Sequence, residues 1–488
     1  MAGGSGGAQV LERRDVWALS AQNPWHPTIE WYARGVKAMQ ARDSAKMADP
    51  RSWRHHAAAH GTDVPARQRP RGSHWNACEH GSWYFLPWHR IYLHHFEKTI
   101  REAIVGLGGP ATWTLPYWNY SDQLQARALP PAFRQTTMPN SADPNPLYVA
   151  ERDPDMNATG VLQAGEVDAV AALNERNFSS AQLAGFGGRS GASIHFGSHP
   201  GAVENTPHGS VHMGVGGTDG WMSDFNTAPL DPIFWLHHAN IDRLWAKWLA
   251  QPGRVNTAER RWLVKKFTFG SGTWQTTLAV RDVLDTTAAP LRYRYGDMPA
   301  AAAQPTAAAD LAQVEEVAPM PKAKPELIGA SDEHVELGNQ PSVAEVRLEP
   351  SKSVLPQARA RASATDEALD AAAAPRTYLR LENVTGTKIS AGGYEVHVNV
   401  PAGAESAGGH PDHRAGHIAL FGVREATRGG EKHTGSGLTF TLDITDLVDK
   451  LAADGKLDPQ TLRVTFTPDD QRAAASDVRV GRVSLYKG

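Results

Sequence analysis

The tryptophans divide this chain of 488 residues into two parts of different composition. All 15 tryptophans lie at or before Trp274, and 15 of the 21 histidines lie at or before His238. The stretch that follows, residues 299–375, is rich in Ala and Pro and has too few aromatic residues to form a core. We therefore expect a tryptophan-rich domain over residues 1–298, a linker over 299–375 and a separate domain over 376–488.

The two parts also differ in the spacing of their apolar residues. In the first part, apolar positions recur at helical spacing in four segments: 28–47, 52–59, 88–104 and 231–249. In the last part, short alternating or β-branched runs are separated by turn residues, and only 445–455 has a helical pattern. These patterns predict a mainly α domain followed by an all-β sandwich. Inside the linker, Val343–Glu349 has the pattern of a single strand.

Composition disfavours several classes of function. The 49 basic and 52 acidic residues are nearly balanced, so the chain offers no field that would hold a nucleic acid. A single cysteine cannot form an internal disulfide. No apolar run of about 18 residues is present, and the N-terminal residues lack a signal-peptide pattern, so we expect a soluble protein without a membrane span. The compartment and the oligomeric state are left open.

Two histidine clusters have the spacing of metal ligands. His208 and His212 are four residues apart, so one helical turn would place both imidazoles on the same face. His237 and His238 follow in an apolar segment, where a buried imidazole needs a polar partner or a metal. The other cluster lies within residues 74–100. Imidazole ligands suit zinc, copper, iron or nickel, and the spacing alone does not choose between them.

The residues around these clusters resemble the paired signatures of the type-3 copper proteins, which are tyrosinases, catechol oxidases (polyphenol oxidases) and molluscan-type haemocyanins. The first signature is matched by His80, Phe85, Trp88, His89, Arg90 and Glu97. The second signature is matched by Asp231, Pro232, Phe234, Trp235, His238 and Asp242. The resemblance covers about residues 10–298 and includes Tyr293-x-Tyr295, a pattern that ends the catalytic domain in plant-like members.

The resemblance implies two copper ions per chain, held in a four-helix bundle. For the first copper it implies His60, His80 and His89. His74 competes with His60, because plant members place a ligand four residues before their cysteine, and His74 stands four residues before Cys78. The second copper would take the remaining three ligands, His208, His212 and His238, and His237 would be structural.

Four other positions gain a role from the same resemblance. Cys78 and His80 match the Cys-x-His of fungal and molluscan relatives, in which the sulfur bonds covalently to the imidazole; the alternative is a buried free thiol. Glu204 matches a glutamate that holds a catalytic water in monophenol-hydroxylating members, but Gly209 stands where those members have Asn. Phe225 stands where plant members have an aromatic gate, and ordinary core packing is its alternative.

The expected activity is the oxidation of o-diphenols to o-quinones by O₂, with small phenols as substrates and with weak or absent monophenol hydroxylation. Three alternatives stay open: a tyrosinase with real monophenolase activity, an o-aminophenol oxidase, and an O₂ carrier similar to haemocyanin. A mononuclear zinc hydrolase is disfavoured, because the HExxH helix of such enzymes is absent.

The β-rich tail is similar, more loosely, to the C-terminal domain of plant-type polyphenol oxidases. That resemblance implies a domain that covers the copper site, inserts a bulky residue and keeps the enzyme latent. Leu420 or Phe421 is the expected plug. We also expect cleavage between Pro299 and Pro375 to raise activity, because Ala- and Pro-rich segments are accessible to proteases.

Overall fold

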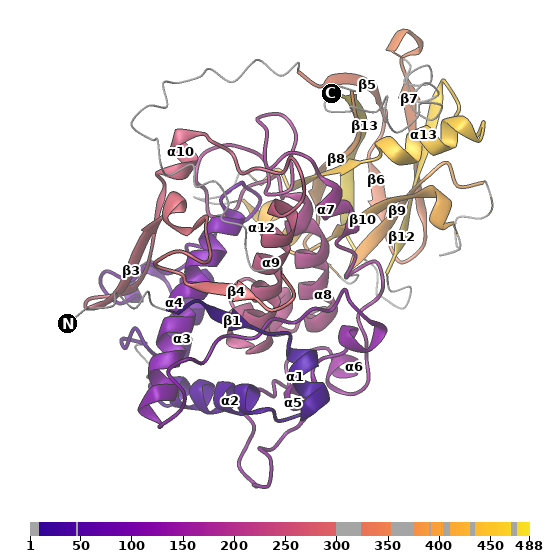
Figure 1. Cartoon of the computed structure of the whole chain (residues 1–488). Coiled ribbons are helices and arrows are strands. Elements are labelled where there is room, and N and C mark those ends of the chain that lie inside the picture. Colours follow the sequence, from indigo (N-terminus) through magenta and orange to yellow (C-terminus); the bar gives the residue numbers. More distant parts are fainter. Residues whose placement is uncertain are drawn as a thin grey trace.

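The structure is a computed structural model, in which a mainly helical part and a β-rich part pack against each other (Figure 1). It describes residues 9–44, 47–298, 324–352, 375–389, 392–401, 403, 410–429, 435–469 and 476–488. None of the described helices is both long enough and apolar enough to cross a membrane.

Four helices from distant parts of the chain form the centre of the helical part (Figure 1). They are α3 (Trp53–His60), α4 (Phe85–Gly106), α8 (Ser210–Gly216) and α9 (Ile233–Leu249), and α2 (Pro27–Gln40) packs against α4. The helices predicted at 28–47, 52–59, 88–104 and 231–249 correspond to α2, α3, α4 and α9, which confirms the mainly helical fold. Only α2 ends earlier than predicted, at Gln40.

Shorter elements connect these helices. They are α1 (Val16–Gln22), α5 (Pro131–Arg134), α6 (Pro154–Asn157), α7 (Val170–Asn174), α10 (Arg260–Leu263), β1 (Leu11–Arg13), β2 (Lys266–Ser271), β3 (Trp274–Ala279) and β4 (Tyr293–Tyr295). The tryptophans of this part supply much of its core, because the fully buried large side chains include Trp83, Trp88, Trp118, Trp235, Trp245, Trp248 and Trp262. The uneven distribution of tryptophan along the chain thus reflects one aromatic core.

Two side chains determine where the histidine-bearing helices begin. Ser52 caps α3, since its hydroxyl accepts a hydrogen bond from the backbone N–H of His55. At the start of α9, Asp231 accepts from the backbone N–H of Ile233 at 2.9 Å. Both carboxylate oxygens of Asp231 also bind Arg152, each at 2.7 Å, in a fully buried pair. A buried bidentate pair of this kind holds the first turn of α9 in one position.

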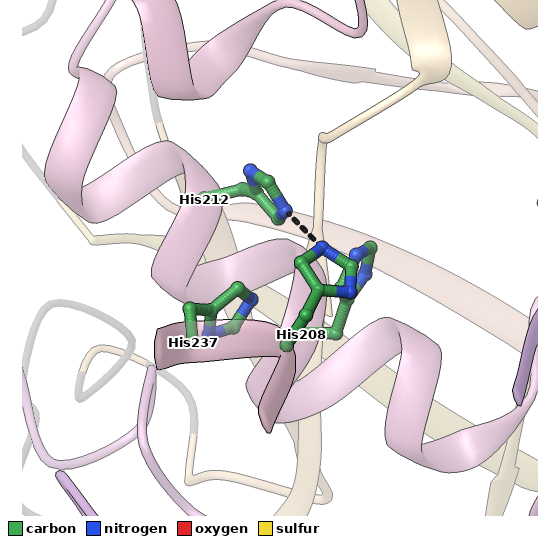
Figure 2. Close-up of side chains that lie close together, drawn as sticks. His208, His212 and His237 are labelled. Carbon is green, nitrogen blue, oxygen red and sulfur yellow. Dashed lines mark hydrogen bonds between the residues drawn. The ribbon is translucent and has the colours of Figure 1, made fainter. Parts of the chain in front are cut away.

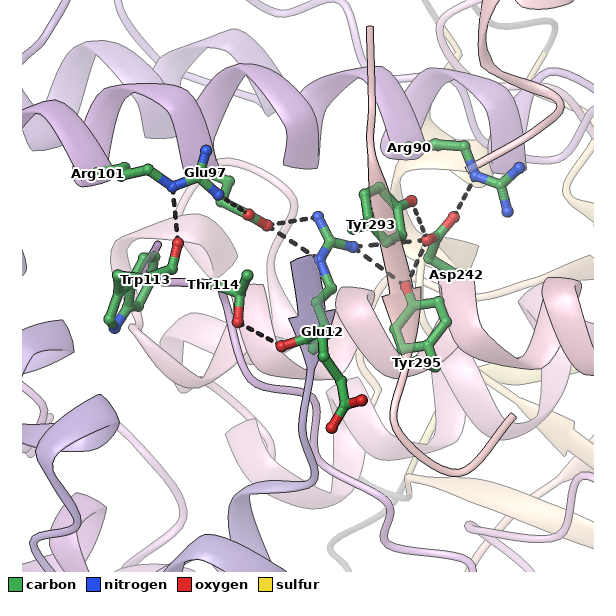
Figure 3. A network of polar contacts seen from close by, with 10 residues as sticks. Glu12, Arg90, Glu97, Arg101, Trp113, Thr114, Asp242, Tyr293 and Tyr295 are labelled. Carbon is green, nitrogen blue, oxygen red and sulfur yellow. Dashed lines mark hydrogen bonds and ion pairs between the residues drawn. The ribbon is translucent and has the colours of Figure 1, made fainter. Parts of the chain in front are cut away.

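A second buried carboxylate, Asp242 of α9, is surrounded by donors (Figure 3). Arg90 of α4 donates to it at 2.5 Å, and the hydroxyl groups of Tyr293 and Tyr295 on β4 also donate to it. Arg13 of β1 lies 3.6 Å away. Through Asp242, the two tyrosines therefore link β4, the last strand of the helical part, to α4 and α9, its two longest helices.

Arg13 extends this network along α4. Its guanidinium donates to Glu97 at 2.7 and 3.0 Å, and Arg101 binds the other oxygen of Glu97 (Figure 3). Arg243, the residue after Asp242 on α9, binds Asp297. Glu97 and Asp242, one acidic residue from each signature, thus bind buried arginines and link β1, α4, α9 and β4.

The β-rich part confirms the predicted all-β fold. Its strands are β5 (Glu326–Ala330), β6 (Val335–Leu337), β7 (Ser342–Leu348), β8 (Thr377–Thr385), β9 (Gly393–Val398), β10 (Arg414–Ala419), β11 (Leu438–Asp443), β12 (Thr461–Pro468) and β13 (Val478–Lys487). Two helices, α12 (Val423–Arg428) and α13 (Thr445–Ala453), lie between strands, and α13 falls in the segment with a helical pattern.

All nine strands belong to one connected sheet, in the order β10-β9-β12-β7-β5-β13-β8-β11 with β6 on β13. The end strands β10 and β11 contact each other, so the sheet folds back around a shared apolar core. Three of its strands, β5, β6 and β7, come from the range 299–375 that the sequence predicted to be a linker. β7 corresponds to the single strand predicted at Val343–Glu349, whereas β5 and β6 correct the prediction. Ile328 of β5 and Leu337 of β6 face the core, but both strands pair with β13, which lies far from them in the sequence. Residues 299–323 and 353–374 of the predicted linker lie outside the described residues.

Candidate metal centre

Six buried histidines form two groups of three inside the bundle. In the first group, His60 ends α3, His80 precedes α4 and His89 lies on α4, with ring centroids 5.0 to 5.5 Å apart. None of these three residues is more than 4% exposed.

The second group faces the first. His208 lies in the turn before α8, His212 on α8 and His238 on α9, with ring centroids 4.7 to 5.5 Å apart (Figure 2). The rings of His89 and His238 stack across the two groups at 4.5 Å. Six imidazoles carried by or next to α3, α4, α8 and α9 therefore lie in one small volume.

The hydrogen bonds of these rings leave nitrogen lone pairs free to bind a metal. Four Nδ1 atoms lie against main-chain carbonyl oxygens: His60 at Phe225 (2.8 Å), His89 at Phe85 (2.8 Å), His208 at Glu204 (3.1 Å) and His212 at Met222 (2.7 Å). An Nδ1–H that donates in this way leaves Nε2 with its lone pair. The buried Nε2 atoms of His60, His89 and His208 have no hydrogen-bond partner among the described residues. Such orphaned acceptors fit a metal ion.

Burial also keeps these rings neutral. It lowers the pKa of His60 to about 3 and lowers the pKa of His89 and His208 well below the usual value for histidine. A neutral imidazole is the form that binds a metal. The donor set has the chemistry of a centre for two copper ions.

The two candidates for the remaining ligand of the first group are placed differently. His60 contacts His80 and, with Cys78 and His80, forms a group whose candidate ligand atoms lie within 4.8 Å of one another. His74 lies outside the bundle, with its Nε2 atom 3.2 Å from the side-chain amide of Gln275. The geometry therefore favours His60.

His237 lies closer to the site than its predicted structural role requires. Together with His208, His212 and His238 it forms a second group of nearby donor atoms (Figure 2). Its Nδ1 atom is 3.2 Å from the hydroxyl of Tyr120, and its ring stacks on His208 at 5.5 Å. Adjacent positions on a helix point about 100° apart. The imidazoles of His237 and His238 nevertheless both contact the rings of His208 and His212, because α8 lies close to α9.

Cys78 is fully buried beside the first group. Its sulfur lies 3.6 Å from the Nδ1 atom of His195, and the same Nδ1 atom lies 2.6 Å from the carbonyl oxygen of Cys78. His195 stands in a loop far from both signatures, so no spacing pattern in the sequence indicates it. Glu79 holds this loop beside the site, because its carboxylate accepts hydrogen bonds from the Ser193 hydroxyl and from the backbone N–H of Ile194.

Glu204 and Gly209 lie on the wall of the site. One carboxylate oxygen of Glu204 accepts from the backbone N–H of Gly81 at 2.7 Å, and the other is buried without a hydrogen-bond partner in the described part of the chain. Burial raises the pKa of Glu204 to about 8. Both residues line a cavity of about 20 Å³ that also touches His80 and His208. The structure therefore brings Glu204 and Gly209, which the resemblance singled out, next to the histidines.

Two phenylalanines close this cavity. The ring of Phe225 lies 4.4 Å from the ring of His80. Phe421, which follows β10, stacks parallel to His212 with ring centroids 4.1 Å and planes 9° apart, and it meets Phe225 at 4.3 Å. Of the two expected plug residues, Phe421 lines the cavity and its ring lies near His80 and His208, whereas Leu420 does not line the cavity.

Comparison with known proteins gives two family matches. Residues 50–251 match the common central domain of tyrosinase, and residues 324–488 match a domain of unknown function (DUF7868). The chain is 35% identical over 491 residues to tyrosinase HcTyr1 of Hahella sp. (strain CCB-MM4), covering 94% of this chain and 96% of that protein.

Plant proteins are similar over a shorter length. The latent form of the chloroplastic polyphenol oxidase of Prunus armeniaca is 30% identical over 285 residues, which are 55% of this chain and 47% of the plant protein. The structure of latent apple tyrosinase aligns over 99% of this chain and 98% of its own, with a TM-score of 0.63 at 21% identity. That likeness shows that the two-part fold is shared.

The chain therefore belongs to the tyrosinase and polyphenol oxidase family of type-3 copper proteins, as the two signatures indicated. It is a copper-dependent oxidoreductase that acts on phenols, with a dinuclear copper centre in the helical part and a C-terminal β-rich domain.

Proposed function

We propose that the chain oxidises o-diphenols to o-quinones with O₂, and that it hydroxylates monophenols weakly or not at all. The observation that carries this proposal is the pairing of Glu204 with Gly209 beside the two histidine groups. We assign the first copper to His60, His80 and His89 and the second to His208, His212 and His238. The bound copper pair supplies the site at which O₂ accepts electrons from the diphenol.

The residues around the histidines orient the substrate ring and exclude water. Phe225 and Phe421 occupy the space in front of His80 and His212, so a substrate ring that replaces Phe421 would lie parallel to His212 and against Phe225. The carbonyl oxygens that accept from the Nδ1 atoms hold four of the six imidazoles, those of His60, His89, His208 and His212, at a fixed rotation.

The residues of this wall are poorly arranged to remove the proton of a monophenol. Glu204 is held by the N–H of Gly81, and Gly209 has no side-chain amide that could position a water beside it. A diphenol makes a smaller demand, because no oxygen has to be inserted into its ring. The arrangement thus supports diphenol oxidation over monophenol hydroxylation.

A pair of rate measurements tests this assignment. With copper loaded to two ions per chain, we expect a simple catechol to be oxidised at least about tenfold faster than the matching monophenol. Comparable rates on both would contradict the proposal. Turnover of o-aminophenol in preference to catechol would instead identify an aminophenol oxidase, and reversible O₂ binding without turnover would identify an O₂ carrier.

A true tyrosinase is the second candidate, because the relative that matches nearly the whole chain is named a tyrosinase. The Gly209→Asn variant separates the two possibilities. If the missing amide limits monophenol hydroxylation, this variant should raise the ratio of monophenol to diphenol rates several-fold. An unchanged ratio, together with a substantial wild-type monophenol rate, would support the tyrosinase assignment. Gly209→Ala is the control, because it adds the Cβ atom that would lie 2.9 Å from the Cβ of Ala419 but brings no amide.

We also propose a covalent bond between the sulfur of Cys78 and the imidazole of His80. It is supported by the burial of Cys78 and by its place in one group with His60 and His80. A thioether would fix the ring of the ligand. Its formation joins the sulfur to a carbon of the imidazole, and the thiol hydrogen and the hydrogen of that carbon pass to O₂, the oxidant of the proposed reaction, which is reduced to H₂O₂. The intact mass of copper-loaded protein should then be two hydrogen atoms below the sequence mass, with no thiol titrated after denaturation. A full thiol signal would reject the bond, and protein produced without copper is the control.

A further inference from the structure

A wide cleft lies where the helical part and the β-rich part meet, and it is separate from the histidine centre. Its volume is about 680 Å³, which is in the usual range for sites that bind small organic molecules. Residues of α7 and α9 line it from the helical part, and residues of β9, β10 and β12 line it from the β-rich part. The described residues that line this cleft differ from those that line the cavity at the histidines. A molecule bound in the cleft would therefore contact both parts of the chain without reaching the histidine centre.

One buried imidazole in the cleft has no polar partner. His397 of β9 is only 6% exposed, and its ring forms no hydrogen bond within the described part of the chain. Burial lowers the pKa of His397, so the ring is neutral and carries one N–H donor. Buried polar groups in proteins are usually hydrogen-bonded. The cleft leaves room for a partner that the chain itself does not supply.

The helical part contributes cations to the same cleft. The guanidinium of Arg127 has no acidic partner in the described part of the chain, and its buried Nε atom has no hydrogen-bond partner there. Lys247 of α9 lies 3.3 Å from Asp297, a carboxylate that already binds Arg243. Positive charge in the cleft is thus only partly neutralised by the protein.

The acidic residues of the cleft do not offset this charge. Arg414 of β10 donates to Glu395 and to Asp168, in both cases at 2.7 Å, so these two carboxylates are already engaged. Asp122, the other carboxylate that lines the cleft, stands at an exposed position. The groups left without a partner inside the cleft are a cation and a neutral imidazole. Such a donor set fits an anion better than a cation.

Apolar side chains form another part of the wall. Val167 and Leu244 lie under the cleft and are each 3% exposed. Val170 of α7 also lines it but is 62% exposed, and Leu173 is partly buried beside it. An apolar body that covered Val170 would remove this surface from water, which is favourable.

We propose that the cleft binds a small organic anion, with its acidic group at Arg127 and His397 and its apolar or aromatic body against Val170 and Leu173. Because Arg127 belongs to the helical part and His397 to the β-rich part, one bound molecule holds the two parts together. The site does not depend on the copper ions or on the oxidation proposed above.

Binding of a naphthalenesulfonate to the copper-loaded full chain tests the site, measured by titration calorimetry at low ionic strength. This probe carries one fixed negative charge on an apolar body. We expect one bound molecule per chain, and at least about tenfold weaker binding of the naphthalenemethanol with the same substitution, which lacks the charge. Equal affinities for the two probes would overturn the proposal. Displacement by inorganic phosphate at equal concentration would also overturn it, because the apolar wall would then contribute nothing.

Two variants locate the bound probe. Arg127→Gln should weaken binding at least about tenfold, and His397→Ala should weaken it several-fold, because each removes one partner of the acidic group. Arg67→Gln is the matched control, since Arg67 is an exposed cation that does not line the cleft. Arg127 does not line the cavity at the histidines, so a loss of binding in Arg127→Gln places the probe in the cleft. Unchanged affinity in both cleft variants, or an equal loss in Arg67→Gln, would contradict the proposal.

Thermal unfolding gives a second readout and shows whether the variants are folded. A ligand that binds only the folded chain raises its melting temperature. The probe should raise the melting temperature of the wild-type and Arg67→Gln chains, and it should have little effect on the Arg127→Gln chain. An equal rise in all three chains would mean that the probe binds elsewhere, and the proposal would fail.

Discussion

The Phe421→Ala variant of the full chain is expected to oxidise small catechols at least about tenfold faster than the wild-type chain, because loss of a buried ring weakens the closed state by a few kcal/mol. The ring of Phe421 stacks on His212 and fills the place in front of both histidine groups. Its removal opens the substrate position and also removes apolar contacts that hold β10 against the helical part. Initial rates at several catechol concentrations measure both effects.

A matched control distinguishes shielding by the ring from general damage to the β-rich part. Leu462 is buried in the core of that part, on β12, and does not line the cavity at the histidines. Leu462→Ala should lower the melting temperature without a comparable rise in rate. Equal rates for Phe421→Ala and the wild type, at equal copper content, would show that Phe421 does not shield the centre.

The Asp242→Ala variant is expected to lose about 3–5 kcal/mol of stability, the usual cost of removing one partner from a buried ion pair. It would leave Arg90 and Arg13, both nearly fully buried, without their shared carboxylate, and would remove the acceptor of both tyrosine hydroxyls. Thermal unfolding of the copper-free chain measures this loss without a contribution from the metal.

Asp297→Ala is the control, since Asp297 also binds an arginine, Arg243, but is one-third exposed. We expect it to cost about 1 kcal/mol or less. Similar losses of stability for both variants would mean that burial does not determine how much the Asp242 network contributes to the free energy of unfolding.

The same network sets a dependence on pH. Burial raises the pKa of Asp242, but the charges of Arg90 and Arg13 outweigh this and lower it below its usual value. A carboxyl whose pKa is lower in the folded chain stabilises the fold above its unfolded pKa, and this contribution is lost as the pH falls through the folded value. The wild-type chain should therefore lose more stability than the Asp242→Ala chain when the pH is lowered below about 4.

Half of the proposed histidine centre could be predicted from contiguous signatures, because His80, His89 and His238 lie within them. The spacing of His208 and His212 and the apolar run around His238 were enough to indicate a metal, and the resemblance supplied copper. The choice between His60 and His74 needed the fold, since both stand at a family spacing and only the end of α3 reaches the bundle centre.

Residues whose role arises from contacts across the sequence could not be predicted. Arg13 meets Glu97 across 84 positions, and Asn205 meets Ala419 across 214. Nothing in the local pattern of either residue signals its partner. The strands β5 and β6 were not predicted for the same reason, because both pair with β13 at the far end of the chain.

The burial of Cys78 has a consequence for the durability of the protein. The o-quinones that the proposed reaction releases are electrophiles, and a thiolate is the side chain that attacks them most readily. Cys78 is the only cysteine in the sequence and is fully buried. The surface of the chain therefore offers no thiol to its own product, and such an enzyme should resist inactivation by arylation during long turnover.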